Sequence, residues 1–291
     1  MALTSFVDGS LFGTRFGDDP PRVVALHGWG RDHRDFDRCL AGLNAVSIDL
    51  PGFGASPAPP QPGGAALYAD LISPILDSCE PPVVLVGHSF GGRVAVHLAE
   101  RRPAAVGGLV LTGVPLLHRA HRKGKPALRF QLGRMLHRWG LVGDSYLEGL
   151  RDKYGSSDYR AASGVMRDIL VTVVNESYEQ QLRAISAPVD LVWGDDDDAA
   201  PPEIAARAEA LLTDARLTIL GGVDHFVPST APTALREAID RRLDALASLP
   251  MRTHLLASSG LWCREHVGCG SHNASITSHY QRLASPFGGG R

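Results

Sequence analysis

Hydrophobic residues along this chain follow two spacings. Short apolar runs are typical of buried strands, whereas longer stretches with apolar residues every three or four positions are typical of helices. The run VVLV at 83–86 contains three β-branched residues and predicts a buried strand, and a helical spacing covers 93–101. Further strands are predicted at 3–7, 10–16, 22–26, 45–48, 108–112, 189–194 and 216–220, and further helices near 35–43, 66–78 and 231–247.

The order of these elements predicts the fold class. Strands and helices alternate, which indicates right-handed crossovers and a mostly parallel central sheet with helices on both faces, an α/β fold. The first two strands are expected to pair antiparallel at one edge. The alternation stops after Pro115 and resumes at Ala187, and the pattern of the residues between them predicts helices. We therefore expect a core formed by 1–115 and 185–249, interrupted by a helical segment at 116–184.

A motif with chemical meaning joins the predicted strand at 83–86 to the predicted helix at 93–101. Gly87, Ser89 and Gly91 form the pattern Gly-x-Ser-x-Gly. The glycines lack the Cβ atoms that would clash if the strand and the helix met in a sharp turn. Such a turn holds the serine in a strained conformation, with its Oγ exposed above a helix N-terminus. Ser89 is therefore the leading candidate for a nucleophile.

A serine nucleophile needs a base and a group that orients that base. In this strand–turn–helix arrangement the acid and then the histidine are expected downstream of the serine. Four consecutive aspartates at 195–198 follow one predicted strand, and His225 follows the next. Both therefore lie just past strand C-terminal ends, where open α/β sheets place their chemistry.

The negative charge that develops on an attacked carbonyl needs hydrogen-bond donors. The glycine-rich loop HGWG at 27–30 follows the predicted strand at 22–26 and leaves backbone N–H groups free to contact a ligand. One of these, paired with the N–H of the residue after the nucleophile, would form a two-donor oxyanion hole. The two donors are the backbone N–H groups of Trp29 and Phe90.

Together these motifs resemble the α/β-hydrolase superfamily. HGWG at 27–30, DLPGFGAS at 49–56, GHSFGG at 87–92, and WGDDD at 193–197 with GVDH at 222–225 occur in the family's order, over roughly 3–247. The resemblance implies a serine hydrolase with a nucleophile elbow at Ser89 and a helical cap at 116–184. The family places the catalytic acid three residues after the strand-ending glycine and four before a proline, which selects Asp197. The expected site then comprises the catalytic residues Ser89, Asp197 and His225, the oxyanion donors Trp29 and Phe90, and the supporting residues His27, Gly28, Gly87, His88 and Gly91.

The composition agrees with an ordinary globular enzyme, at 44% hydrophobic and 21% charged residues over 291 positions. No apolar run approaches the roughly 20 residues of a membrane span, and the N-terminus lacks the pattern of a signal peptide. Four scattered cysteines are too few for a disulfide framework, which favours a reducing cytoplasm. We expect a cytoplasmic protein that acts on a small-molecule ester or acyl substrate, without a nucleic-acid partner; the oligomeric state stays open.

Two segments have unusual compositions. Residues 116–143 contain seven cations and neither Asp nor Glu. They could attract an anionic substrate or contact an anionic membrane, although a solvated surface is the favoured interpretation. Residues 250–291 show no sustained period, and we expect a disordered tail. Its evenly spaced cysteines and histidines are too compact to wrap one zinc ion, so no metal site is expected; they are Cys263, His266, Cys269 and His272.

The resemblance makes hydrolysis of a carboxylic ester or thioester through an acyl-enzyme the default expectation, with no metal or organic cofactor. A serine at position 89 argues against the epoxide hydrolases and haloalkane dehalogenases of this superfamily, which carry Asp there. Carbon–carbon bond hydrolysis, acyl transfer to another acceptor, and haloperoxidase or lactonase activity use the same three residues and stay open. A non-enzymatic binder of a small molecule is the alternative from another class.

Overall fold

The computed structural model describes residues 2–119 and 157–248. The larger part of the predicted cap, with six of its seven cations, lies outside these residues. The predicted disordered tail at 250–291 and its pattern of cysteines and histidines lie outside them as well. Sequence expectations for those segments therefore stay predictions.

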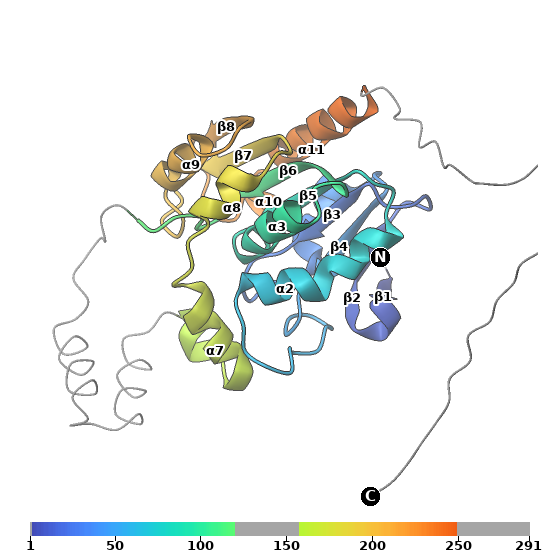
Figure 1. Ribbon diagram of the computed structural model, residues 1–291, viewed down its shortest axis with the longest axis vertical. Helices are drawn as coiled ribbons and strands as arrows, with labels where there is room; N and C mark the ends of the chain where they lie inside the picture. Colours follow the sequence, from blue (N-terminus) through green and yellow to red (C-terminus); the bar gives the residue numbers. More distant parts are fainter. Residues whose placement is uncertain (1, 120–156, 249–291) are drawn as a thin grey trace, which may run out of the picture. The chain divides into compact units, whose positions relative to one another are not determined.

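An eight-stranded sheet forms the centre of the described chain, in the order β1-β2-β4-β3-β5-β6-β7-β8 (Figure 1). The first two strands pair antiparallel at one edge, and β2 also runs antiparallel to its neighbour β4. From β4 onward all neighbours are parallel. The predicted α/β class with a mostly parallel sheet is thus confirmed. The strands are β1 (Leu3–Phe6), β2 (Leu11–Phe16), β3 (Val23–Leu26), β4 (Ala45–Asp49), β5 (Val83–His88), β6 (Val106–Thr112), β7 (Val189–Gly194) and β8 (Ala215–Leu220).

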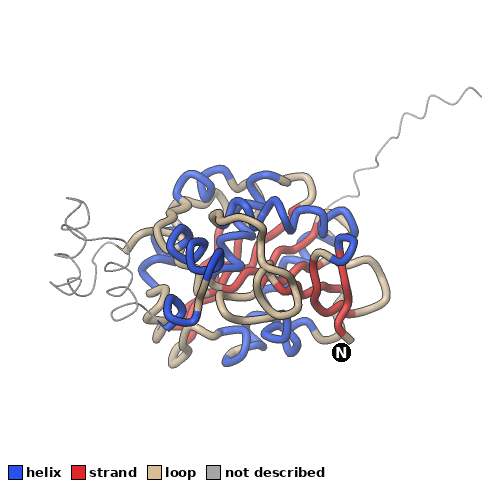
Figure 2. Tube along the Cα trace, turned by 90° about the horizontal axis from the view of Figure 1, so that it is seen from below, coloured by secondary structure: helices blue, strands red, loops and turns tan. Residues whose placement is uncertain are grey.

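Helices cover both faces of this sheet (Figure 2). Alternate residues of a strand point to opposite faces, so β3 contributes Val24 and Leu26 to one apolar cluster and Val23 and Ala25 to another. Buried residues of α2, α3, α8 and α9 belong to the first cluster, and those of α1, α10 and α11 to the second. The helices that carry these residues are α1 (Asp37–Leu40), α2 (Ala65–Ile72), α3 (Phe90–Arg101), α8 (Glu179–Ala184), α9 (Pro202–Glu209), α10 (Val227–Thr230) and α11 (Pro232–Ala247).

Two predicted helices are shorter than their apolar spacing indicates. The helix expected over 66–78 ends at Ile72 and continues as the 3₁₀ helix η3 (Ser73–Ser78). Pro74 lacks the N–H that an α-helix needs at that position. The helix expected over 35–43 consists of the 3₁₀ helix η2 (His33–Phe36) followed by α1, and it ends where Ala41 adopts an extended ψ of 127°.

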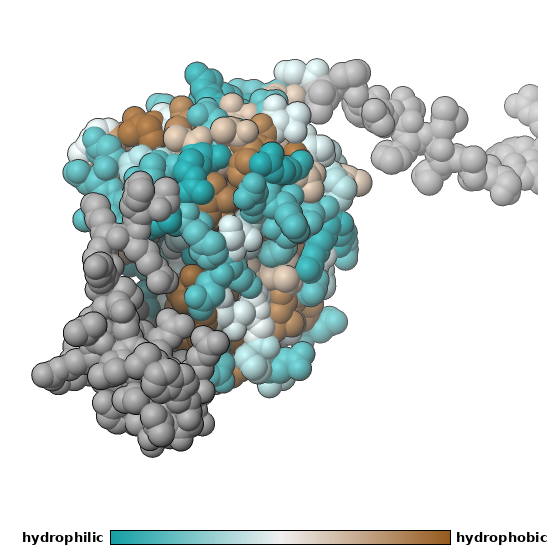
Figure 3. All heavy atoms as spheres, turned by 60° about the vertical axis from the view of Figure 1, so that its left-hand side comes forward, coloured by the Kyte–Doolittle hydropathy of each residue, from teal (hydrophilic) through white to brown (hydrophobic). Residues whose placement is uncertain are grey.

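The predicted cap is described at 116–119, which contains no helix, and at 157–184. The second stretch contains α6 (Ser157–Ala161), α7 (Gly164–Val173) and α8. In α7, Ile169, Leu170 and Val173 are buried and join the same apolar cluster as α2 and α3. Figure 3 shows mostly polar side chains on the described surface of one face, with apolar ones in small groups. No helix in the described ranges is long and apolar enough to cross a membrane.

One buried carboxylate fixes α11 to the sheet. Asp190 lies on β7 with a fully buried side chain. Its Oδ1 accepts hydrogen bonds from Arg241 Nε and Nη2 at 3.2 and 3.0 Å, and its Oδ2 accepts one from Arg242 Nε. Both arginines belong to α11, so this helix is held to the sheet by a charged cluster in addition to apolar packing.

Replacement of Asp190 by alanine should lower the free energy of unfolding by about 3 kcal/mol, because two arginines would lose their shared counter-ion. Urea denaturation measures this change. The exposed i,i+4 pair of Glu179 and Arg183 supplies a control, since Glu179→Ala should change the same free energy by no more than about 0.5 kcal/mol. Equal effects of the two substitutions would contradict the role given to Asp190.

Candidate active site

A strained turn between β5 and α3 presents Ser89. Its φ of 50° and ψ of −111° lie where residues other than glycine are rare. The turn is possible because Gly87 and Gly91, on either side of Ser89, leave room for other backbone segments that lie very close to them. A Cβ on Gly91 would lie 2.1 Å from Leu26 O, and a Cβ on Gly87 would lie 2.4 Å from the Cα of Gly92. Side chains at either glycine would force the turn apart.

Asp197 and His225 come together at the ends of β7 and β8. The Oδ2 atom of Asp197 lies 2.8 Å from Nδ1 of His225. The other carboxylate oxygen accepts from the backbone N–H groups of Ala199 and Ala200 at 2.9 and 2.7 Å. Asp197 is only 2% exposed, so its carboxylate is fixed by three hydrogen bonds in a site that excludes water. This arrangement lets His225 donate from Nδ1 and keeps Nε2 available as a base.

The neighbouring acids lie elsewhere. Asp195, Asp196 and Asp198 are exposed, whereas Asp197 is buried. The Asp195 carboxylate accepts from the backbone N–H of Gly222, and Asp224 accepts from the N–H of Phe226. Of the four consecutive aspartates, Asp197 is therefore the one whose carboxylate contacts the histidine.

One cavity connects these residues. It has a volume of about 470 Å³, and Ser89 and His225 both line it together with Trp29 and Phe90. In the described part of the chain, no hydrogen bond joins Ser89 to His225. Hydrogen bonds between catalytic groups are often long before substrate binds, so this geometry is compatible with a serine–histidine pair.

The loop after β3 supplies backbone donors. The N–H of Gly91 donates to His27 O at 3.0 Å, which holds this loop against the start of α3. Within the described ranges, the backbone N–H groups of Trp29 and Phe90 donate to no protein acceptor, and both residues line the cavity with Ser89. Their rings pack edge to face with centroids 5.4 Å apart. The predicted oxyanion donors are thus neighbours with free N–H groups.

His27 and Gly28 shape this loop. His27 is fully buried; its Nε2 accepts from the N–H of Leu50 at 2.9 Å, and its Nδ1 lies 2.7 Å from Gly28 O. The ring therefore joins the loop after β3 to the loop after β4. A Cβ on Gly28 would lie 2.8 Å from Nδ1 of His88 and 3.3 Å from the Cβ of Ser89, so only glycine lets the loop approach the nucleophile so closely.

His88 supports the loop that carries His225. Its Nε2 lies 3.0 Å from the backbone carbonyl of His225, and the two ring centroids are 4.9 Å apart. A carbonyl can only accept, so Nε2 donates and Nδ1 carries no proton. Burial, assisted by the nearby His225, lowers the pKa of His88 to about 3. His88 is therefore a neutral positioning residue, not a base.

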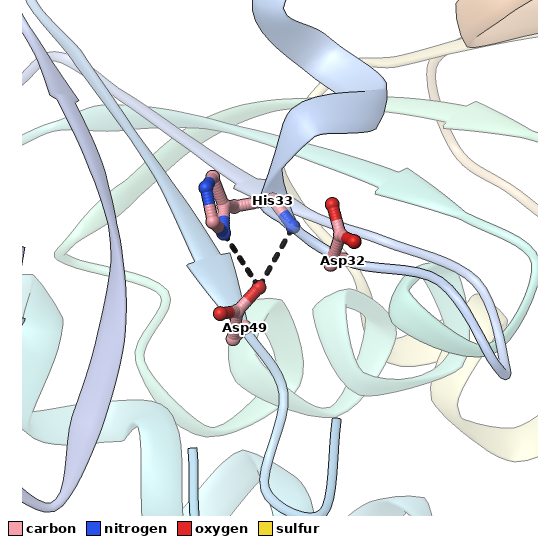
Figure 4. Close-up of side chains that lie close together, drawn as sticks. All are labelled: Asp32, His33 and Asp49. Atoms are coloured by element: carbon pink, nitrogen blue, oxygen red, sulfur yellow. Dashed lines mark hydrogen bonds and ion pairs between the residues drawn. The ribbon is translucent and has the colours of Figure 1, made fainter. Parts of the chain in front are cut away.

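A cluster of acids and a histidine lies beside the site in η2 and at the end of β4 (Figure 4). One oxygen of Asp49 accepts from the backbone N–H and Nδ1 of His33, at 2.8 and 2.7 Å, and the other accepts from Ala55 N–H at 2.9 Å. Asp32 accepts from the backbone N–H and Nε of Arg34 at 3.0 and 2.9 Å. These oxygens already have donors, so the cluster is explained as the support of two loops, without a metal ion.

Several residues that line the cavity escaped the sequence analysis. Val174 and Phe226 are 57% and 40% exposed, and the cavity explains these apolar surfaces. Asp158 and Arg93 supply charges. Arg93 could have been noticed, because a charged residue four positions after the nucleophile lies one helical turn from it.

The low pKa of His88 predicts how stability depends on pH. The unfolded chain binds a proton at His88 near pH 6.5, whereas the folded protein binds none until about pH 3. The stabilisation is therefore complete above pH 6.5 and is lost as pH falls, by about 2 kcal/mol at pH 5. Urea denaturation at pH 7 and pH 5 measures how much unfolding free energy is lost between these two pH values. This loss should be smaller for His88→Asn than for the unchanged protein. An equal loss in both would contradict a neutral, buried His88.

Comparisons with known proteins show what this chain is similar to. A pimeloyl-[acyl-carrier protein] methyl ester esterase of Neisseria meningitidis is 27% identical over 231 residues, which cover 72% of this chain and 88% of that protein. The esterase Rv0045c of Mycobacterium tuberculosis is 37% identical over 111 residues, 36% of this chain and 37% of its own length. The crystal structure of Rv0045c matches with a TM-score of 0.59 at 24% identity, covering 84% of this chain and 91% of that one.

The fold is shared more widely. A hydrolase from Pseudomonas aeruginosa has a TM-score of 0.60 at 20% identity and covers 83% of this chain and 97% of its own. A sequence model of the alpha/beta hydrolase family matches residues 23–238, well over half of the chain. The chain therefore belongs to the alpha/beta hydrolase family.

Proposed function

We propose that this protein is a serine hydrolase that cleaves a carboxylic ester or thioester through an acyl-enzyme. The observation that carries the proposal is the hydrogen bond that joins Asp197 to His225, a histidine that lines the same cavity as the strained Ser89. A buried carboxylate on Nδ1 favours the tautomer in which Nε2 can accept a proton, and it stabilises the imidazolium that forms.

The first half-reaction forms the acyl-enzyme. His225 Nε2 takes the proton of the Ser89 hydroxyl while Oγ attacks the carbonyl carbon of the ester. The carbonyl oxygen becomes an oxyanion, which accepts hydrogen bonds from the N–H groups of Trp29 and Phe90. When the tetrahedral intermediate collapses, the bond to the alcohol or thiol breaks. The leaving group then takes the proton from His225.

The second half-reaction releases the acid. A water molecule gives a proton to His225 Nε2 and attacks the acyl carbon, and the oxyanion again lies against the two N–H groups. Collapse breaks the bond to Ser89 Oγ, which recovers its proton from His225. Both half-reactions need only residues that line this cavity, together with Asp197 behind the histidine.

The relatives support an ester as substrate. Two of them are named esterases, and one of these names specifies the methyl ester of a pimeloyl group on a carrier protein. A cavity of about 470 Å³ suits a small to medium acyl chain. Carbon–carbon cleavage, acyl transfer, and haloperoxidase or lactonase activity would use the same residues, and no described feature favours one of them. The free oxyanion donors and the paired histidine favour an enzyme over a binding protein.

The choice among the four aspartates can be tested directly. Asp197→Asn removes the acceptor that fixes the tautomer of His225 and should lower kcat by about 10³- to 10⁴-fold. Asp196→Asn is the matched control, because Asp196 is exposed and should leave kcat within about twofold. Steady-state hydrolysis of p-nitrophenyl butyrate measures both. A large loss in Asp196→Asn with little change in Asp197→Asn would overturn the assignment.

The reaction class is tested by a substrate screen. p-Nitrophenyl esters from acetate to decanoate should be cleaved at rates that exceed the Ser89→Ala background by several orders of magnitude, since Ser89→Ala removes the attacking oxygen. A vinylogous diketone of the ring-fission type serves as the comparison substrate. Cleavage of the diketone with ester turnover no faster than the background would identify a carbon–carbon hydrolase instead.

A further inference from the structure

A buried arginine lies one helical turn beyond the nucleophile. Arg93 follows Ser89 by four residues on α3, which corresponds to about 6 Å along the helix axis, and it is 7% exposed. It lines the catalytic cavity and also an adjoining cavity of about 650 Å³. Pro115, Val174 and Ala199 line both cavities as well, so the two meet at Arg93.

The hydrogen-bonding capacity of Arg93 is only partly used. Its Nη1 donates to Val173 O at the end of α7, and the guanidinium carbon lies 5.8 Å from the ring centroid of Tyr178. Its Nε is buried and has no hydrogen-bond partner among the described residues. No carboxylate in the described ranges forms an ion pair with it. Because a buried cation without a counter-ion is unfavourable, the site is incomplete without an anion.

The acid whose charge acts on Arg93 is Glu176, and its carboxylate is engaged elsewhere. Glu176 lines the adjoining cavity, and its Oε2 accepts from the hydroxyl of Tyr178 at 2.5 Å and from the N–H of Ala65 at 3.2 Å. Burial lowers the pKa of Arg93, while interactions with Tyr178, a side-chain hydrogen bond among them, and the charge of Glu176 act in the opposite direction. An arginine nevertheless stays protonated in proteins, so a positive charge faces the junction of the cavities.

We infer that Arg93 binds a carboxylate at the far end of the substrate's acyl chain. The enzyme would then prefer monoesters or monothioesters of dicarboxylic acids over esters of simple fatty acids. This inference rests on the proposed function, because it names the substrate class of the same site. The acyl chain stays attached to Ser89 between the two half-reactions, so a contact at its far end assists both. A helical turn and an arginine side chain together suit a spacer of about three or four methylene groups.

A purely structural role is the competing explanation. The bond from Arg93 to Val173 O ties α7 to the core, and loss of that tie would affect every substrate alike. The ratio of kcat/KM for an anionic ester to that for a neutral ester of the same length separates the two roles. Mono-p-nitrophenyl adipate and p-nitrophenyl hexanoate form such a pair.

The unchanged protein should prefer the adipate monoester at least tenfold in kcat/KM, after subtraction of the Ser89→Ala background. Arg93→Gln should lower this ratio at least tenfold, and Arg93→Lys should restore part of it. Arg101→Gln is the control, because it removes an exposed arginine from the same helix and should leave the ratio unchanged. A ratio near one in the unchanged protein, or one that Arg93→Gln does not alter, would overturn the inference.

A binding measurement separates failure of this inference from failure of the proposed function. Monomethyl adipate and methyl hexanoate can be titrated calorimetrically into the Ser89→Ala variant, with and without Arg93→Gln. Tighter binding of the adipate that depends on Arg93 would support the anion site even if neither ester is hydrolysed. Equal binding of both compounds would overturn the inference even if both esters are hydrolysed.

Discussion

The close approach of backbone segments at the turn between β5 and α3 is the constraint on which the site depends. Ser89 adopts a positive φ there, and its turn fits only because Gly91 lies against the end of β3 and Gly87 against Gly92. A strained backbone conformation of this kind persists where the surrounding contacts are sufficient to hold it in place. Here the N–H of Ser89 donates to Thr112 O at the end of β6, and that of Gly91 donates to His27 O just after β3, so the ends of two neighbouring strands hold the turn.

Glycines at other positions likewise let the loop that carries His225 lie close to the nucleophile. Gly113 has a φ of 58°, and a Cβ on it would lie 3.0 Å from the ring of His225. A Cβ on Gly194 would lie 2.1 Å from Val223 O. Glycines just past β6 and at the end of β7 therefore let the loop that carries His225 approach the sheet. The parallel strands place these loops at one edge, where an acid, a base and free N–H groups can act on one carbonyl.

Much of this arrangement could be predicted from the sequence, because short apolar runs and glycine positions are local signals. The strands at 189–194 and 216–220 coincide with β7 and β8. The pattern of the family that the chain resembles, applied to Gly194 and Pro201, selected the one aspartate that contacts His225. The helix lengths at 35–43 and 66–78 were wrong, since apolar spacing does not separate an α-helix from a 3₁₀ helix. The position of Arg93 one helical turn after Ser89 is visible in the sequence, but its burial without an ion-pair partner among the described residues becomes visible only when α7 and Tyr178 pack against it.

Trapping of the covalent intermediate tests the central claim most directly. The protein would be mixed with a p-nitrophenyl ester and quenched in acid within the first turnovers, and its peptides would be mapped by mass spectrometry. The account predicts one added acyl group, located on Ser89, and no added acyl group in the Ser89→Ala variant. An acyl group on another residue, or ester turnover by Ser89→Ala as fast as by the unchanged protein, would contradict a Ser89 acyl-enzyme.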